Sequence, residues 1–145
     1  MTGYTIGYGR GEIEPRIAPL VEAVQKAGFV TFSSCEGHEE IDDQALPRFT
    51  SVAFYGHEDE AKYVHSFFLR YRERLACSWC FRGSFVYHRE TNQFRLGWTL
   101  ENCGFIQQVD DATEFVTRTV QAGWNTDIPA LMEMFAEIGT CKASD

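Results

Sequence analysis

Residues 77–100 read CSWCFRGSFVYHRETNQFRLGWTL, and this stretch decides the fold class. Large apolar side chains fall at alternate positions in Trp79–Tyr87 and again in Phe94–Leu100, which is the period of a β-strand with one buried face. The polar run 89–92 predicts the turn of a β-hairpin. Arg82-Gly83 interrupts the first strand and predicts a bulge or a bend. We expect the returning strand to direct four side chains into the core: Phe94, Leu96, Trp98 and Leu100.

A helix precedes this hairpin, and the same order of elements occurs once more upstream. The helix begins in the acidic run 58–60 and carries an apolar stripe at helical spacing. Upstream, residues 17–24 predict a helix that Gly28 ends, and Phe29–Ser34 and Phe49–Tyr55 predict two strands. The helix–strand–strand unit therefore occurs twice, at 15–55 and 58–100. We predict an α+β fold, with an antiparallel or mixed sheet covered by helices on one face.

The remaining segments complete a single domain over residues 1–145. Asp111 and Glu114 resemble a capping box, and we expect this helix to end at Gly123. Asp127 predicts the start of a last helix, which Gly139 should end. These C-terminal helices span 110–139. The glycine-rich residues 1–11 predict a mobile arm or an edge strand.

Composition excludes several classes of protein. With 44% hydrophobic and 23% charged residues, the chain is neither collagen-like nor disordered. No apolar run approaches the roughly 18 residues of a membrane span, and the first residues lack the order of a signal peptide, so we expect a cytoplasmic protein without a membrane partner. The odd number of cysteines, 5 in all, favours reduced thiols over a disulfide framework.

The formal charge of −8 is unevenly distributed. Residues 62–99 carry 7 basic and 2 acidic groups, whereas both flanking segments are acidic. Three arginines lie among aromatic residues in this segment: Arg82, Arg89 and Arg95. This pattern is typical of a sheet that binds nucleic acid, with bases stacked on the rings and phosphates bound by the arginines. The alternative is that the aromatic side chains fill the core and the arginines face solvent. The acidic ends favour a different function, a non-catalytic interaction protein of phage or plasmid type that binds a basic partner.

The loop after the first strand concentrates reactive side chains. It reads Thr-Phe-Ser-Ser-Cys-Glu-Gly-His over residues 31–38. Cys35 and His38 are candidates for a nucleophile and its base. A small anionic ligand or a nucleotide is the expected partner, and the candidate ligand-binding residues are Ser33, Ser34, Gly37, Arg48 and Arg82. The alternative is a tight turn in which the hydroxyls bond to the backbone and Cys35 packs inward.

Zinc is a further alternative. Cys35-x2-His38 and Cys77-x2-Cys80 together supply the four ligands of a Cys3His site. Alternation along the strand favours opposite faces for Cys77 and Cys80, so we assign no metal ligand and leave the cofactor open.

The same loop resembles the motif Thr-x-Ser-Ser-Cys-x-Gly-Arg of the wybutosine-synthesising tRNA methyltransferase family, the third enzyme of that pathway. Thr31, Ser33, Ser34, Cys35 and Gly37 match this motif, and His38 stands where the family has arginine. The resemblance covers residues 28–100 and implies methyl transfer from S-adenosylmethionine to a base in tRNA. Small bacterial proteins of unknown role with a Ser-Cys-x-Gly-His stretch are the closer likeness.

Overall fold

The computed structural model describes residues 13–38, 48–107 and 109–144. The arm or edge strand expected at 1–11 lies outside these ranges. The elements follow in this order: α1 (Ala18–Lys26), β1 (Thr31–Cys35), β2 (Ser51–Tyr55), α2 (Glu58–Tyr71), β3 (Cys77–His88), β4 (Gln93–Phe105), α3 (Ala112–Ala122) and α4 (Ile128–Ser144). The predicted α+β class is confirmed, and so is the repeated helix–strand–strand order. Within the described part of the chain, no helix is both long and apolar enough to cross a membrane.

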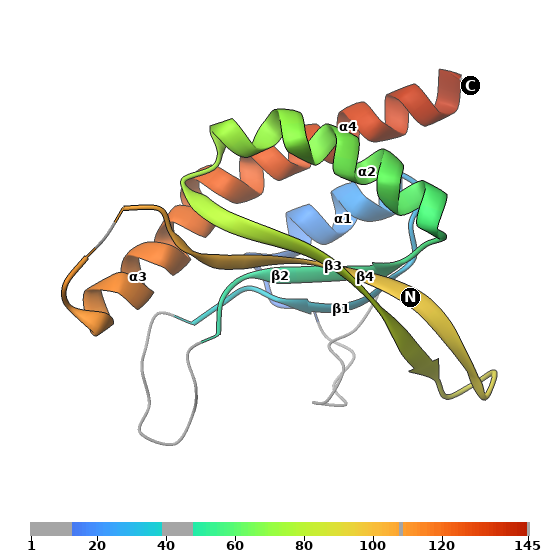
Figure 1. The fold of residues 1–145 in the computed structure, drawn as a ribbon, viewed down its shortest axis with the longest axis horizontal. Helices are drawn as coiled ribbons and strands as arrows, with labels where there is room; N and C mark the ends of the chain where they lie inside the picture. The colour runs from blue at the N-terminus through green and yellow to red at the C-terminus, as the bar shows by residue number, and fades with distance from the viewer. Residues whose placement is uncertain (1–12, 39–47, 108, 145) are drawn as a thin grey trace.

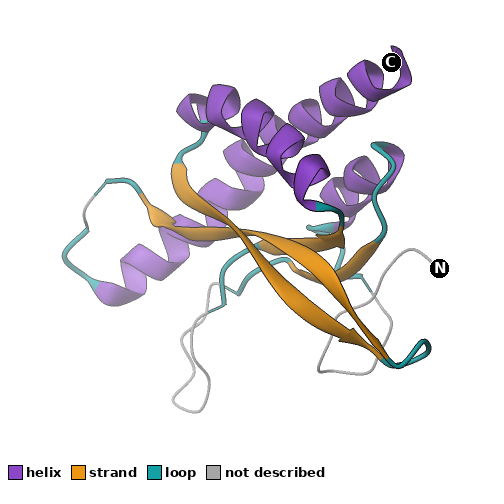
Figure 2. Cartoon of the chain, turned by 45° about the vertical axis from the view of Figure 1, so that its right-hand side comes forward, coloured by secondary structure: helices purple, strands orange, loops and turns teal. Residues whose placement is uncertain are grey.

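The four strands form one antiparallel sheet in the order β1-β2-β4-β3. Helices α1, α2 and α4 lie on the same side of this sheet, as predicted (Figure 1). Strand β2 pairs with β4 only between Gly97 and Glu101, while β3 and β4 stay paired as far as His88 and Gln93. The end of the β3–β4 hairpin therefore projects away from the helices as a two-stranded ribbon (Figure 2).

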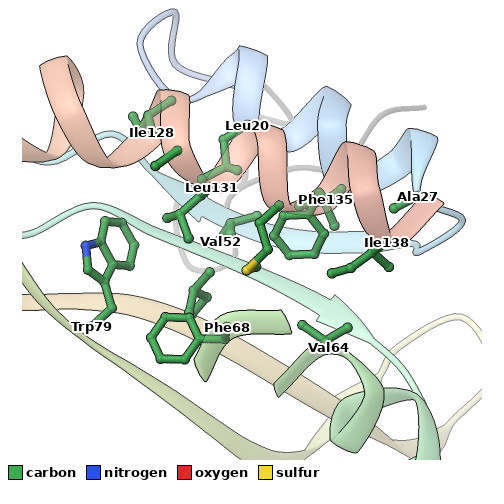
Figure 3. Packing of buried hydrophobic residues seen from close by; sticks show 14 of the residues in the cluster. Leu20, Ala27, Val52, Val64, Phe68, Trp79, Ile128, Leu131, Phe135 and Ile138 are labelled. Carbon is green, nitrogen blue, oxygen red and sulfur yellow. The ribbon is translucent and has the colours of Figure 1, made fainter. Parts of the chain in front are cut away.

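The hydrophobic core fills the space between the helices and the sheet (Figure 3). Helices α1 and α4 approach closely at Gly139, where a Cβ would lie 3.3 Å from the Cα of Ala27. The prediction that Gly139 ends the last helix is wrong, because this glycine serves close packing and the helix continues to Ser144.

The α-helix α3 ends at Gly123 as predicted, but no loop follows it. The chain continues through a π-helical turn, Gly123–Asp127, into α4. Asp127 is buried, and its carboxylate accepts hydrogen bonds from the backbone of Ala76 and Cys77 and from the indole of Trp79. It therefore fastens the helices to the start of β3. The predicted cap at Asp111 is confirmed, since its carboxylate accepts from the backbone N–H of Glu114 at 2.9 Å.

The hairpin differs from the prediction in two respects. The register shift lies between Ser78 and Trp79, whereas Gly83 is regularly paired. Gly83 instead makes room for the indole of Trp98, because a Cβ there would lie 2.7 Å from a ring carbon. Trp98 and Leu100 pack into the core as expected, but Phe94 is exposed because the ribbon has passed beyond the helices.

The expectation of reduced cysteines is wrong for two of the five. Cys80 on β3 and Cys103 on β4 form a disulfide, with their Cα atoms 6.4 Å apart. The register shift leaves Cys103 without a partner residue on β3, which allows its sulfur to reach Cys80. A cysteine count contains no information about strand register, so this pairing could not be foreseen.

The basic segment is partly neutralised within the molecule. Arg70 and Arg74, at the end of α2, form ion pairs with Glu137 and Glu133 of α4. Tyr71, between these arginines, donates a hydrogen bond to Glu137 at 2.5 Å. These ion pairs therefore neutralise part of the positive charge of the basic segment and part of the negative charge of α4.

Candidate functional site

Three side chains of metal-binding type meet at the end of β1. Cys35 is the last residue of β1, His38 follows in the loop, and Glu14 lies in the segment before α1. One ligand atom from each residue lies within 4.8 Å of the others. The His38 Nε2 atom is 3.9 Å from the Glu14 Oε2 atom. A carboxylate, a thiol and an imidazole therefore converge on one point near the surface.

The loop geometry places Cys35 and His38 on the same side of a tight turn. Gly37 has a φ of 91°, a left-handed conformation that favours glycine. A Cβ on Gly37 would lie 3.2 Å from the backbone nitrogen of Thr50 and 3.3 Å from the carbonyl oxygen of Arg48. The His38 N–H donates to that same carbonyl at 2.9 Å, which fastens the loop to the segment before β2. The site therefore requires glycine at this position.

Glu36 fixes the loop through contacts with distant segments. Its carbonyl oxygen accepts hydrogen bonds from the Thr50 hydroxyl at 2.9 Å and from the Trp124 indole at 2.7 Å. Its carboxylate accepts from the backbone N–H of Arg16 at 2.8 Å, and its own N–H donates to Glu14 at 3.1 Å. The last bond also orients the Glu14 carboxylate. Cys35 and His38 are thus held on a rigid backbone, and Glu14 is held against it.

The charge around Cys35 opposes a thiolate. The pKa of the Cys35 thiol lies above its ordinary value of 9.0, chiefly because of burial; the N–H of Gly37 lowers it, and the carboxylates of Glu14 and Glu36 raise it. In a triad of nucleophile, base and acid, the carboxylate contacts the far side of the imidazole and not the thiol. Here Glu14 contacts the thiol itself. The arrangement therefore suits a cation better than a free nucleophile.

The predicted site residues are brought only partly together. Ser33 and Cys35 lie on the sheet face away from the helices, whereas Ser34 is buried on the helix side opposite Val52. Gly37 and Arg48 border the turn. Arg82 shares its row across the sheet with Ser33, but two strands separate them. Its guanidinium is 2.8 Å from the carboxylate of Glu101.

The four-ligand zinc set suggested by the sequence is not formed. Cys80 is bonded to Cys103, and the buried Cys77 thiol donates to the carbonyl oxygen of Thr119 at 3.5 Å. Cys35 and His38 have Glu14 as their third member instead. Sequence analysis missed Glu14 because it lies 21 positions before Cys35 in no recognisable spacing. Which carboxylate lies near the Cys35-x2-His38 pair is determined by the tertiary structure.

Comparison with protein families, with curated proteins and with solved structures finds no match to this chain.

Proposed function

We propose that this protein binds a transition-metal cation of the Zn²⁺ type through Glu14, Cys35 and His38. The observation that supports this function is the convergence of one oxygen, one sulfur and one nitrogen ligand within 4.8 Å. Tetrahedral Zn²⁺ has bonds of about 2.0–2.3 Å, which keeps neighbouring ligand atoms about 3.4 Å apart. The 3.9 Å between His38 and Glu14 is close to that value, so small side-chain rotations complete the site.

The ligand set also accounts for the charge of the site. The Glu14 carboxylate and a Cys35 thiolate together balance a divalent cation, and the neutral His38 imidazole supplies the third bond. His38 lies at the surface, which leaves a fourth position open to water or to an atom of a bound molecule. A metal with one open position binds anions such as phosphate or carboxylate, in agreement with the small anionic ligand expected from the sequence. Of the predicted anion-binding residues, Arg48 is bonded to the site through its backbone, since its carbonyl oxygen accepts from His38 N.

Metal titration tests this proposal directly. Chelator-treated protein should take up one Zn²⁺ per chain in a calorimetric titration, and Co²⁺ should give a thiolate charge-transfer band. Cys35→Ser should abolish that band, and Glu14→Gln and His38→Ala should each weaken binding at least tenfold. Cys141→Ser and His65→Ala are matched controls on distant elements, and they should change neither property.

Two results would contradict the proposal. In the first, Cys35→Ser keeps the charge-transfer band, which would place the sulfur ligand elsewhere. In the second, all three ligand variants bind Zn²⁺ as the parent chain does. Alkylation of Cys35 tests the alternative in which Cys35 and His38 act as nucleophile and base. Fast alkylation at neutral pH would support that alternative, whereas the charge around Cys35 leads us to expect slow alkylation.

The relationship to the tRNA methyltransferase family is a separate proposal that depends on the loop motif alone. Titration with S-adenosylmethionine tests it, and saturable binding that His38→Arg strengthens would support it. A function through the acidic ends is less favoured, because Glu133 and Glu137 pair with arginines of the same chain.

A further inference from the structure

The end of the β3–β4 hairpin, residues 84–96, carries features that the metal site does not explain. Among the residues that the structure describes, β4 pairs only with β3 from Gln93 to Leu96, and the last contact with the neighbouring segment is the bond from Gly56 N to the carbonyl oxygen of Leu96 at 3.2 Å. The ribbon projects away from the helices (Figure 2). We call residues 84–96 the hairpin end.

One face of the hairpin end presents aromatic rings to solvent. Phe85 pairs with Leu96 and Tyr87 pairs with Phe94, and directly opposed residues of antiparallel strands share a face. The exposed fractions are 75% for Phe85, 49% for Tyr87 and 69% for Phe94. The centroids of Tyr87 and Phe94 are 5.5 Å apart, and neighbouring pairs along the ribbon are about 6.8 Å apart. The three exposed rings therefore lie near one another on the same face of the hairpin end.

The charge around these rings is positive in a chain whose net charge is −8. Arg89 and Arg95 lie within the hairpin end, and Glu90 is the one acidic residue between positions 82 and 95, whereas Arg82 beside it is paired with Glu101. The Arg95 guanidinium lies on the opposite face of the sheet, 4.1 Å from the ring centre of Tyr55. Because the ribbon is only two strands wide, an extended chain crossing the rings passes within reach of these long side chains.

We propose that the hairpin end binds single-stranded nucleic acid, with bases stacked on Phe85, Tyr87 and Phe94 and phosphates beside Arg89 and Arg95. Stacking on exposed rings combined with positive charge is the common basis of single-strand recognition. A second copy of the chain fits this surface less well, because it would bring two positively charged hairpins together. The most exposed hydrophobic side chains at the hairpin end are rings, which favours bases over an aliphatic peptide.

Fluorescence anisotropy with labelled oligonucleotides tests this proposal. We expect saturable binding to single-stranded oligo(dT) and oligo(U) that weakens from 50 to 200 mM salt, as about two phosphate contacts would require. Phe85→Ala and Phe94→Ala should each weaken binding about tenfold, the loss of one stacked base. Phe85→Leu and Phe94→Leu keep an apolar side chain without the π-face and should weaken binding nearly as much. Leu69→Ala, an exposed apolar residue on α2, is the matched control and should have no effect.

Three outcomes would overturn the proposal. The first is equal binding by the leucine variants and the parent, which would show an apolar contact in place of stacking. The second is a duplex that binds as tightly as the single strand. The third is no oligonucleotide binding, together with self-association in sedimentation that Phe94→Ala abolishes, which would identify the face as a contact between copies. The ring variants should bind Zn²⁺ normally, so failure here leaves the metal proposal untouched.

Discussion

Replacing Asp127 with alanine should destabilise the protein strongly. The buried carboxylate accepts hydrogen bonds from Ala76 N at 2.7 Å, Cys77 N at 3.1 Å and Trp79 Nε1 at 2.8 Å. The variant leaves three N–H groups without this acceptor, and a buried unpaired donor costs about 1–3 kcal/mol. Water that enters the space recovers part of this cost, so we expect a loss of about 3–5 kcal/mol in the free energy of unfolding.

Urea denaturation followed by circular dichroism measures this loss. Against a total stability of about 5–15 kcal/mol, it should lower the denaturation midpoint markedly and the melting temperature by about 10–15 °C. Trp79→Phe removes one donor and keeps a smaller aromatic ring, so it should cost about 1–2 kcal/mol. Asp110→Ala, at an exposed position, should cost less than about 0.5 kcal/mol. A loss below about 1 kcal/mol for Asp127→Ala would refute the structural role that we give to this carboxylate.

Three further predictions follow from other contacts. Burial raises the pKa of the Cys77 thiol to about 12. Above pH 9 the unfolded chain releases a proton that the folded chain retains, so the free energy of unfolding should fall from pH 9 towards 12. The urea midpoint should fall less steeply over this range in Cys77→Ala. Reduction of the Cys80–Cys103 disulfide, which spans 23 positions, should cost about 3 kcal/mol and add 2 Da, whereas an unchanged mass would show that no disulfide was present. Gly37→Ala should cost about 1–2 kcal/mol of stability because of its positive φ, and it should weaken Zn²⁺ binding. The matched control Gly56→Ala should do neither. Equal Zn²⁺ affinity in both variants would show that binding does not depend on the conformation of Gly37.

The fold could be predicted as far as local periodicity determines it. Alternation in residues 77–100 identified the hairpin, and Asp111 identified the start of α3 because its carboxylate bonds to a residue three positions away. Gly123 ends α3 as predicted, whereas α4 continues past Gly139. Both glycines serve close contacts between elements, so their role depends on packing partners that are distant in the sequence. A helix-ending glycine and a packing glycine look the same in one sequence.

Two of the three residues of the candidate site could be predicted from the sequence. Cys35 and His38 were found because a turn between strand and loop gathers its side chains locally. Glu14 joins them only because Glu36, inside the same turn, bonds to both Glu14 and the backbone of Arg16. The sequence places Glu36 next to Cys35 but contains no sign of which distant segment its carboxylate holds. The position of Glu14 beside Cys35 and His38 is therefore a consequence of tertiary structure.

The π-helical turn between α3 and α4 links this site to the rest of the fold. Trp124 bonds to the carbonyl oxygen of Glu36 after β1, and Asp127 bonds to the start of β3, although β1 and β3 are the two outer strands. Between them, a Cβ on Gly123 would lie 3.1 Å from Asn102 of β4 and 3.2 Å from Thr50, beside β2. One turn of five residues thus contacts the same end of all four strands. Because Trp124 and Asp127 project from the same turn, the position of the loop that carries Cys35 and His38 depends on the buried carboxylate that holds β3.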